Sequence, residues 1–179
     1  MRNTCLPAVL FSTLLVVAQN SEAPILMSHN KVDGLLGGQH HTEDLQVFAN
    51  SRVLFAEEGT TALGKPFHAS YTEQIDAVEV THLAALLGSR AARSLPRRIP
   101  SKTRPIDFFW QVSLGIGRGN GSQKIDVENF LPFGTTLGQP YPRTLIELEC
   151  TVQSIQTKAA KRTQLSAEES WCKKLLAAQ

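Results

Sequence analysis

The chain has 179 residues, of which 42% are hydrophobic and 19% are charged, so it can bury a core and is not a disordered chain. Its 18 Lys and Arg residues against 16 Asp and Glu residues give a net charge of +2, which is too small to indicate a nucleic-acid-binding protein. Three cysteines exclude a disulfide-dense miniprotein and a multi-finger zinc module. No apolar run reaches the ~18 residues that a membrane-spanning helix needs.

The first residues have the pattern of a secretory signal peptide. Arg2 precedes an apolar stretch from Cys5 to Ala18, and a polar run follows. Cleavage after the small residue Ala18 would make residues 1–18 the signal peptide and residues 19–41 a glycine-rich flexible leader. The alternative is a buried N-terminal helix of a cytosolic protein. We therefore expect a secreted or extracellular protein, or a periplasmic one if the host is bacterial, with no transmembrane segment once the signal is removed.

Export changes the interpretation of two sequence features. Cys5 would leave with the signal, and Cys150 and Cys172 would remain as an even pair that an oxidising compartment would join in a disulfide bond. Asn120 begins the triplet Asn-Gly-Ser in a glycine-rich turn, which is a glycosylation acceptor if the host is eukaryotic.

Residues 42–89 are predicted to be helical. Thr42 can cap a first helix that ends near Gly59 and places Leu45, Phe48, Arg52 and Phe55 on one face. A β-hairpin that turns at residues 49–51 is the alternative, because Leu45 and Val47 would then alternate with polar residues in one strand, and Val53 and Phe55 in the next.

A second helix is predicted after the capping box that Ser70 and Glu73 form, and Gly88 would end it. The residues expected on its apolar face are Ile75, Val78, His82, Ala85 and Leu86.

Residues 90–105 are basic, rich in proline and free of acidic residues, which indicates an exposed linker. Arg90 and Arg93 have the R-x-x-R spacing of furin-like convertase sites, and Arg97 with Arg98 forms a dibasic site. Two interpretations of this segment stay open: an uncut linker with weak affinity for polyanions, and a proprotein that is cleaved at these sites.

Residues 106–179 are predicted to form three antiparallel strands and a C-terminal helix. Hydrophobic residues alternate with polar or small ones over residues 108–116, 125–127 and 146–152, as in strands with one solvated face. A second capping box at residues 166–169 would begin a helix that carries Cys172. The predicted fold class is α+β, with N-terminal helices followed by a small three-stranded antiparallel sheet and a C-terminal helix.

Catalytic and cofactor motifs are incomplete. Residues 59–65 have the G-x4-G-K spacing of a phosphate-binding loop, but Pro66 lacks the hydroxyl that would hold magnesium. His40 and His41 lie beside acidic residues, yet adjacent histidines in a strand or helix point apart, so they indicate at most a weak surface zinc or copper site. We assign no catalytic, cofactor-binding or metal-ligating residue.

The function predicted from the sequence is a secreted, non-catalytic binding or signalling protein, and cleavage in the basic linker would make it a proprotein. Its expected partner is an extracellular protein or receptor, and the contact surface would be the sheet face with Phe109, Gln111 and Ser113 or the loop at residues 131–142. The alternative is a small secreted or periplasmic hydrolase or metal-dependent enzyme.

Overall fold

A computed structural model describes residues 23–35, 40–61, 63–100, 108–117, 122–128, 141–162 and 172. The predicted signal peptide, Asn120, the loop at residues 131–142 apart from its last two residues, and the predicted C-terminal helix apart from Cys172 lie outside these ranges.

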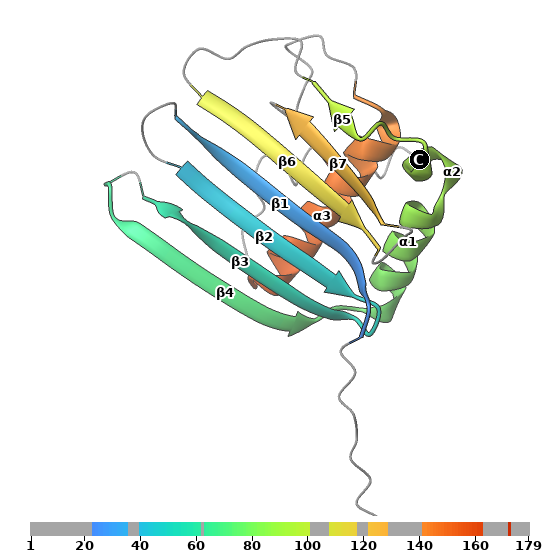
Figure 1. The fold of residues 1–179 in the computed structure, drawn as a ribbon. Coiled ribbons are helices and arrows are strands. Elements are labelled where there is room, and N and C mark those ends of the chain that lie inside the picture. Colours follow the sequence, from blue (N-terminus) through green and yellow to red (C-terminus); the bar gives the residue numbers. More distant parts are fainter. Residues whose placement is uncertain are drawn as a thin grey trace, which may run out of the picture.

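In the described part of the chain, the fold is a seven-stranded mixed sheet with three helices on one side (Figure 1). The strand order is β4-β3-β2-β1-β6-β7-β5, and all neighbours are antiparallel except β5 and β7. The strands are β1 (Ile25–Leu35), β2 (His40–Phe48), β3 (Arg52–Thr60), β4 (Pro66–Gln74), β5 (Arg98–Ile99), β6 (Phe108–Ile116) and β7 (Gln123–Glu128). The helices are α1 (Ala77–Gly88), α2 (Arg90–Arg93) and α3 (Arg143–Ala159).

The predicted fold class is wrong, first of all in the N-terminal half. Residues 42–58 form β2 and β3 instead of a helix, and the hairpin that was the alternative is the observed structure. Leu45 pairs with Phe55 and Val47 with Val53, so one face of both strands is buried in the core. The turn between the strands places Ser51 at a φ of 67°, and the backbone N–H of Arg52 donates to the Asn50 side chain.

The second predicted helix is present but begins later than expected. The expected capping box at residues 70–73 lies within β4, and α1 begins after Asp76, whose side chain accepts a hydrogen bond from the backbone N–H of Val78 at 2.9 Å. The residues of α1 that face the core are Val80, Leu83 and Leu87. Val78 and His82, expected on the apolar face, are exposed because they lie on the opposite side of the helix.

The basic segment is folded over residues 90–100. Arg90–Arg93 form α2, and Arg98–Ile99 form β5, which pairs with β7. Ala92, Leu95 and Ile99 are buried. An exposed linker is therefore wrong for this part of the segment, because small and apolar residues between the arginines anchor it to the core.

The C-terminal half contains one correct and one wrong strand prediction. β6 and β7 form the predicted antiparallel hairpin. The third predicted strand is part of the 17-residue helix α3, so the small three-stranded sheet does not exist as predicted. The side chains of α3 in the apolar core recur at helical spacing: Leu145, Leu148, Val152, Ile155 and Ala159.

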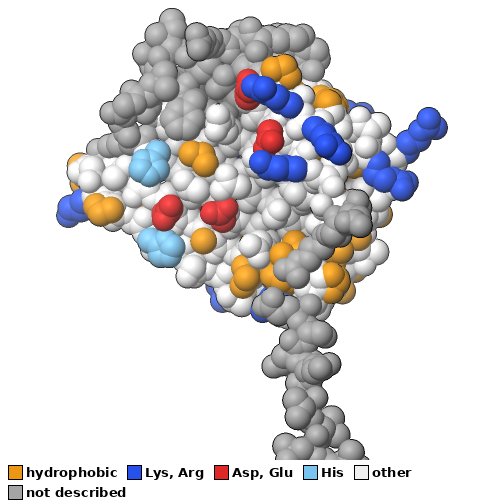
Figure 2. Space-filling view, viewed as in Figure 1, with side chains coloured by type: hydrophobic (Ala, Val, Ile, Leu, Met, Phe, Trp, Pro, Cys, Tyr) orange, Lys and Arg blue, Asp and Glu red, His pale blue; other side chains and the backbone are white. Residues whose placement is uncertain are grey.

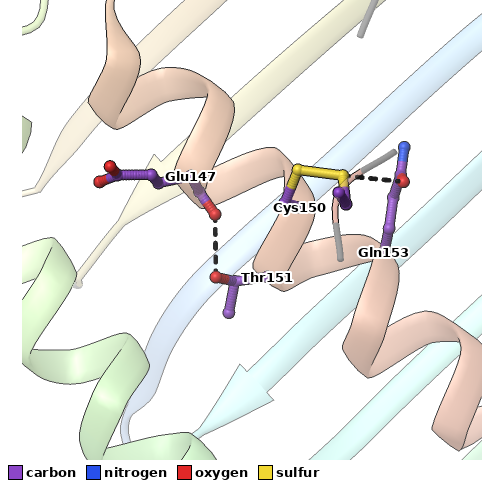
Figure 3. The surroundings of a disulfide bond; sticks show 5 residues. Glu147, Cys150, Thr151 and Gln153 are labelled. Atoms are coloured by element: carbon purple, nitrogen blue, oxygen red, sulfur yellow. Dashed lines mark hydrogen bonds between the residues drawn. A yellow bond between two sulfur atoms is a disulfide. The ribbon is translucent and has the colours of Figure 1, made fainter. Parts of the chain in front are cut away.

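The predicted disulfide bond is confirmed. Cys150 on α3 is bonded to Cys172, with their Cα atoms 5.3 Å apart, and both cysteines are buried (Figure 3). The Cys172 sulfur also lies 3.6 Å from the Gln153 side-chain oxygen. The bond ties residue 172 to the helix that covers the sheet.

A polar pair lies inside the core between the sheet and α3. The Nε2 atom of His29 on β1 is 3.0 Å from a carboxylate oxygen of Glu149, and both side chains are almost fully buried. His29 Nδ1 and Glu149 Oε1 have no hydrogen-bond partner among the described residues. This pair links strand and helix across the centre of the core.

Candidate functional site

Charged side chains and a few polar partners gather on the helix-facing side of the sheet, next to the C-terminal end of α3. We call this group the charged cluster. Its members share one sheet face or reach it from α3 and the residues after it: Lys31, Asp33, His41, Glu43, Glu57, Tyr71, Gln156 and Arg162.

The strand register brings the cluster together. Asp33 on β1 is paired with His41 on β2, and Glu43 on β2 is paired with Glu57 on β3. Because side chains two residues apart in a strand point to the same face, His41 and Glu43 both face α3. Three adjacent strands thus place a histidine among three carboxylates.

His41 lies at the centre of the cluster. Its Nδ1 atom is 3.7 Å from Asp33 Oδ2, and its Nε2 atom is 3.9 Å from both Glu43 Oε1 and Glu57 Oε2. The Asp33 carboxylate raises the pKa of His41, with Glu43 adding to the effect against the opposing influence of burial. Burial would raise the pKa of Asp33, but His41 and Lys31 together lower it.

The two glutamates oppose each other directly across the strands, a pairing of like charges that is unfavourable without compensation. Glu43 Oε2 accepts a hydrogen bond from Gln156 Nε2 at 3.3 Å and lies 3.9 Å from Lys31 Nζ. Glu57 accepts hydrogen bonds from Arg162 and, at 3.2 Å, from the Tyr71 hydroxyl. Burial and Glu57 raise the pKa of that hydroxyl.

A second candidate site is a hollow of about 710 Å³ on the opposite, open face of the sheet. Figure 2 shows this face, where uncharged side chains and backbone predominate and Lys and Arg gather toward β7 and β5. Small and polar side chains on the central strands line much of the hollow, among them Ser28, Asn30, Asp44, Gln46, Ser113 and Lys124.

Hydrogen bonds fix several of these side chains. The Asn30 amide donates to Asp44 at 2.6 Å, and the Ser113 hydroxyl donates to Asp126 at 2.5 Å. The Ser113 hydroxyl, with Lys124 and Arg98, lowers the pKa of Asp126. At Gly115 an added Cβ would lie 2.3 Å from the Ser28 hydroxyl, so the glycine keeps this part of the surface open.

The site residues predicted from the sequence are distributed over several elements. Cys150 and Cys172 are joined by the disulfide bond. Arg90 and Arg93 are exposed on α2, and Arg97 lines the open-face hollow. Arg98 Nε donates a hydrogen bond to Glu128 Oε1 at 2.9 Å. Of the predicted contact surface, Gln111 is exposed and Ser113 lines the hollow, whereas the Phe109 side chain is not described.

The sequence pointed to His41 beside acidic residues, but the other members of the charged cluster were not predicted. The signal that could have revealed part of it is the i, i+2 spacing of His41 and Glu43, which share a face only if residues 40–48 form a strand. The sequence contains no direct sign that Glu57 and Asp33 join them, because that depends on the registers of two strand pairs.

In the part of the chain that the structure describes, no helix combines the length and apolar character needed to cross a lipid bilayer. No protein-family model matches the chain, and no curated protein is similar enough in sequence to count as a match. The geometry of the two sites is therefore the basis for any statement about function.

Proposed function

We propose that this chain is an exported, non-catalytic binding protein, and that the hollow on the open sheet face contacts a polar segment of an extracellular protein partner. The single observation that carries the proposal is this hollow of about 710 Å³, formed on rigid strands by side chains held in place by hydrogen bonds.

Two features support export. Cys150 and Cys172 form a disulfide bond. Such bonds form and persist in oxidising compartments, which proteins enter by export. The sequence of residues 1–18 has the charge and hydrophobicity pattern of a signal peptide. A polyanion contact through the exposed Arg90, Arg93 and Arg97 is a weaker part of the same proposal.

Polarity supports a protein partner for the hollow. Small-molecule sites are mostly lined by apolar and aromatic side chains, whereas protein surfaces in transient contact have many hydrogen bonds. Ser28, Asn30, Gln46 and Ser113 offer donors and acceptors, and Lys124 adds a positive charge at the rim.

Binding can be tested with the secreted chain and a panel of extracellular receptor domains. Gln46→Arg would place a larger, positively charged side chain in the hollow and is expected to reduce binding at least 10-fold, because a misplaced charged side chain costs on the order of 1.4 kcal/mol or more. Thr72→Arg is the matched control: Thr72 lies in the same row of the sheet, since Gln46 pairs with Leu54 and Leu54 with Thr72, but outside the hollow. Absence of binding across the panel, or equal losses in both variants, would contradict the proposal.

Proteolytic processing is the finer part of this proposal. Cleavage after Arg93 requires local unfolding of α2, because proteases cut exposed and flexible segments. Ala92 within α2 and Leu95 just after it are buried. Intact-mass measurement of the secreted product distinguishes a chain that begins at Gln19 from one that begins at Ser94 or Ile99. A single product that begins at Gln19 would contradict processing and leave the binding proposal intact.

A small hydrolase or metal-dependent enzyme is the second candidate, and the charged cluster favours it. The cluster places a histidine between carboxylates in a partly exposed position. These residue types act as general acids and bases and as metal ligands in enzymes.

A further inference from the structure

We propose that His41, Glu43 and Glu57 form a binding site for a divalent transition-metal ion, with Zn²⁺ as the best match. The three side chains each offer one ligand atom, and these atoms lie within 4.8 Å of one another. Imidazole nitrogen and carboxylate oxygen are both zinc ligands, and three protein ligands with a free position for water are typical of open zinc sites. The inference is independent of the partner proposed for the open face.

The backbone supplies the arrangement. His41 and Glu43 are two residues apart on β2, and Glu57 lies directly opposite Glu43 on β3. The hairpin of β2 and β3 is paired on both sides by β1 and β4, so the three positions are rigid. Their side chains are only 29%, 10% and 13% exposed, which limits competition from water.

The distances fit an ion after small side-chain rotations. His41 Nε2 is 3.9 Å from an oxygen of each glutamate. Ligand bonds of about 2.1 Å in a tetrahedron place neighbouring donors about 3.4 Å apart. A contraction of roughly half an ångström brings His41 Nε2 to this spacing from each glutamate. The ligand oxygens of the two glutamates lie within 4.8 Å of each other and would have to approach by up to about 1.4 Å.

The surrounding residues orient the ligands as in metal centres. Metal-binding histidines commonly place their second ring nitrogen against a carboxylate, and ligating carboxylates are themselves hydrogen-bonded. Here Asp33 faces His41 Nδ1 at 3.7 Å, which leaves Nε2 directed at the glutamates. Glu43 Oε2 is held by Gln156 and Glu57 Oε1 by Tyr71, so Glu43 Oε1 and Glu57 Oε2 are the oxygens that face His41.

Lys31 and Arg162 compensate the negative charge of Glu43 and Glu57, and they lie at different distances from the position proposed for the ion. Lys31 lies 3.9 Å from the outer oxygen of Glu43, Oε2, so it does not occupy the position of the ion. Arg162 donates to Glu57 Oε2, the same oxygen that faces His41. Arg162 is 40% exposed and can move toward solvent, so it acts as a competitor for the ion.

Titration calorimetry of Zn²⁺ into the metal-free, untagged, disulfide-bonded chain tests the site. The expected result is one ion per chain in the charged cluster, with at least 10-fold weaker binding in His41→Ala and in Glu57→Gln. Asp33→Asn is expected to weaken binding about 10-fold, as changes in residues that orient a ligand commonly do.

Two further variants separate metal binding from a purely structural ion-pair network. Arg162→Gln is expected to tighten zinc binding, because it removes the competitor at Glu57 Oε2 and leaves all three ligands in place. His68→Ala is the matched control: His68 lies 3.8 Å from Glu58 on the exposed face of neighbouring strands, and its loss is expected to leave zinc affinity unchanged.

Several results would overturn the proposal. One is the absence of zinc binding by the wild-type chain. A second is an unchanged zinc affinity in His41→Ala and Glu57→Gln when both variants show native circular dichroism. A third is a loss of zinc affinity in His68→Ala as large as the loss in the ligand variants. If His41→Ala fails to fold, the nearly isosteric Glu57→Gln and the gain expected from Arg162→Gln still decide the question.

Discussion

The two faces of the sheet carry similar chemical groups in different surroundings. On the helix-facing side, His41 lies beside Glu43 and Glu57, and the three side chains are at most 29% exposed. On the open side, His68 lies beside Glu58, and these side chains are 66% and 61% exposed. The Asp33 carboxylate raises the pKa of His41 and Glu43 adds to the effect, whereas burial opposes it. The exposed fractions show that burial rather than residue type distinguishes the two clusters.

The interior of the protein also contains a histidine beside a glutamate. The pair of His29 and Glu149 is the fully buried counterpart of the exposed pair of His68 and Glu58. Charged groups inside a protein depend on each other, since each has lost its water.

The largest effect is expected from His29→Ala. The substitution leaves the Glu149 carboxyl group buried without its partner, which typically costs about 3–5 kcal/mol in the free energy of unfolding. Urea denaturation of the purified chain measures the loss. A loss below about 1 kcal/mol would mean that Glu149 finds water or another donor, and that the pair is not a strong link between β1 and α3.

Removal of the disulfide is expected to be the next largest effect. Cys150 and Cys172 are 22 residues apart, and closing a loop of this length stabilises a protein by about 3 kcal/mol through the entropy of the unfolded chain. Cys172→Ser should lower the free energy of unfolding by that amount, measured in urea. Addition of a reductant to the wild-type chain is the control and should give the same decrease. A reductant with no effect would contradict a structural role for the bond.

The strand pair β6 and β7 was predictable from the sequence, whereas α3 was not. Val112 and Leu114 alternate with polar or small residues, and no competing periodicity covers the same segment. Over residues 146–152 an alternating pattern coexists with the helical spacing of Leu145, Leu148 and Val152, and only the continuation to Ile155 and Ala159 distinguishes them.

The site was less predictable than the fold because it depends on register. β2 and β3 join through a turn in which Ser51 adopts a positive φ without the glycine that usually signals such a turn. If a helix is expected to begin at Thr42 and His41 is placed in the leader before it, His41 and Glu43 no longer share a face, and Glu57 cannot lie opposite Glu43. The sequence therefore supplies the ligand types, and tertiary pairing supplies their positions.

An intermediate effect, dependent on pH, is expected at Asp126 on the open face. Its pKa is lowered from 3.8, chiefly by the Ser113 hydroxyl, so the folded state prefers the charged carboxylate. The stability that this carboxylate contributes is present above pH 3.8 and is lost as the pH falls through the lower pKa of the folded state. The wild-type chain should exceed Asp126→Asn in stability at pH 6, and the difference should shrink at pH 3. A constant difference between the two pH values, measured by urea denaturation, would contradict this assignment.

The smallest effect is expected from His68→Ala. Exposed ion pairs contribute little because water already solvates both groups and salt screens their attraction, and His68 and Glu58 are both more than half exposed. Urea denaturation at pH 6 and low salt should therefore give a change below about 0.5 kcal/mol. The contrast with His29→Ala is the informative quantity, since both substitutions remove an imidazole that faces a glutamate. If His68→Ala destabilised the protein as much as His29→Ala, burial would not be what separates the two faces, and the open face would have to make contacts of comparable strength through the edge strand β4.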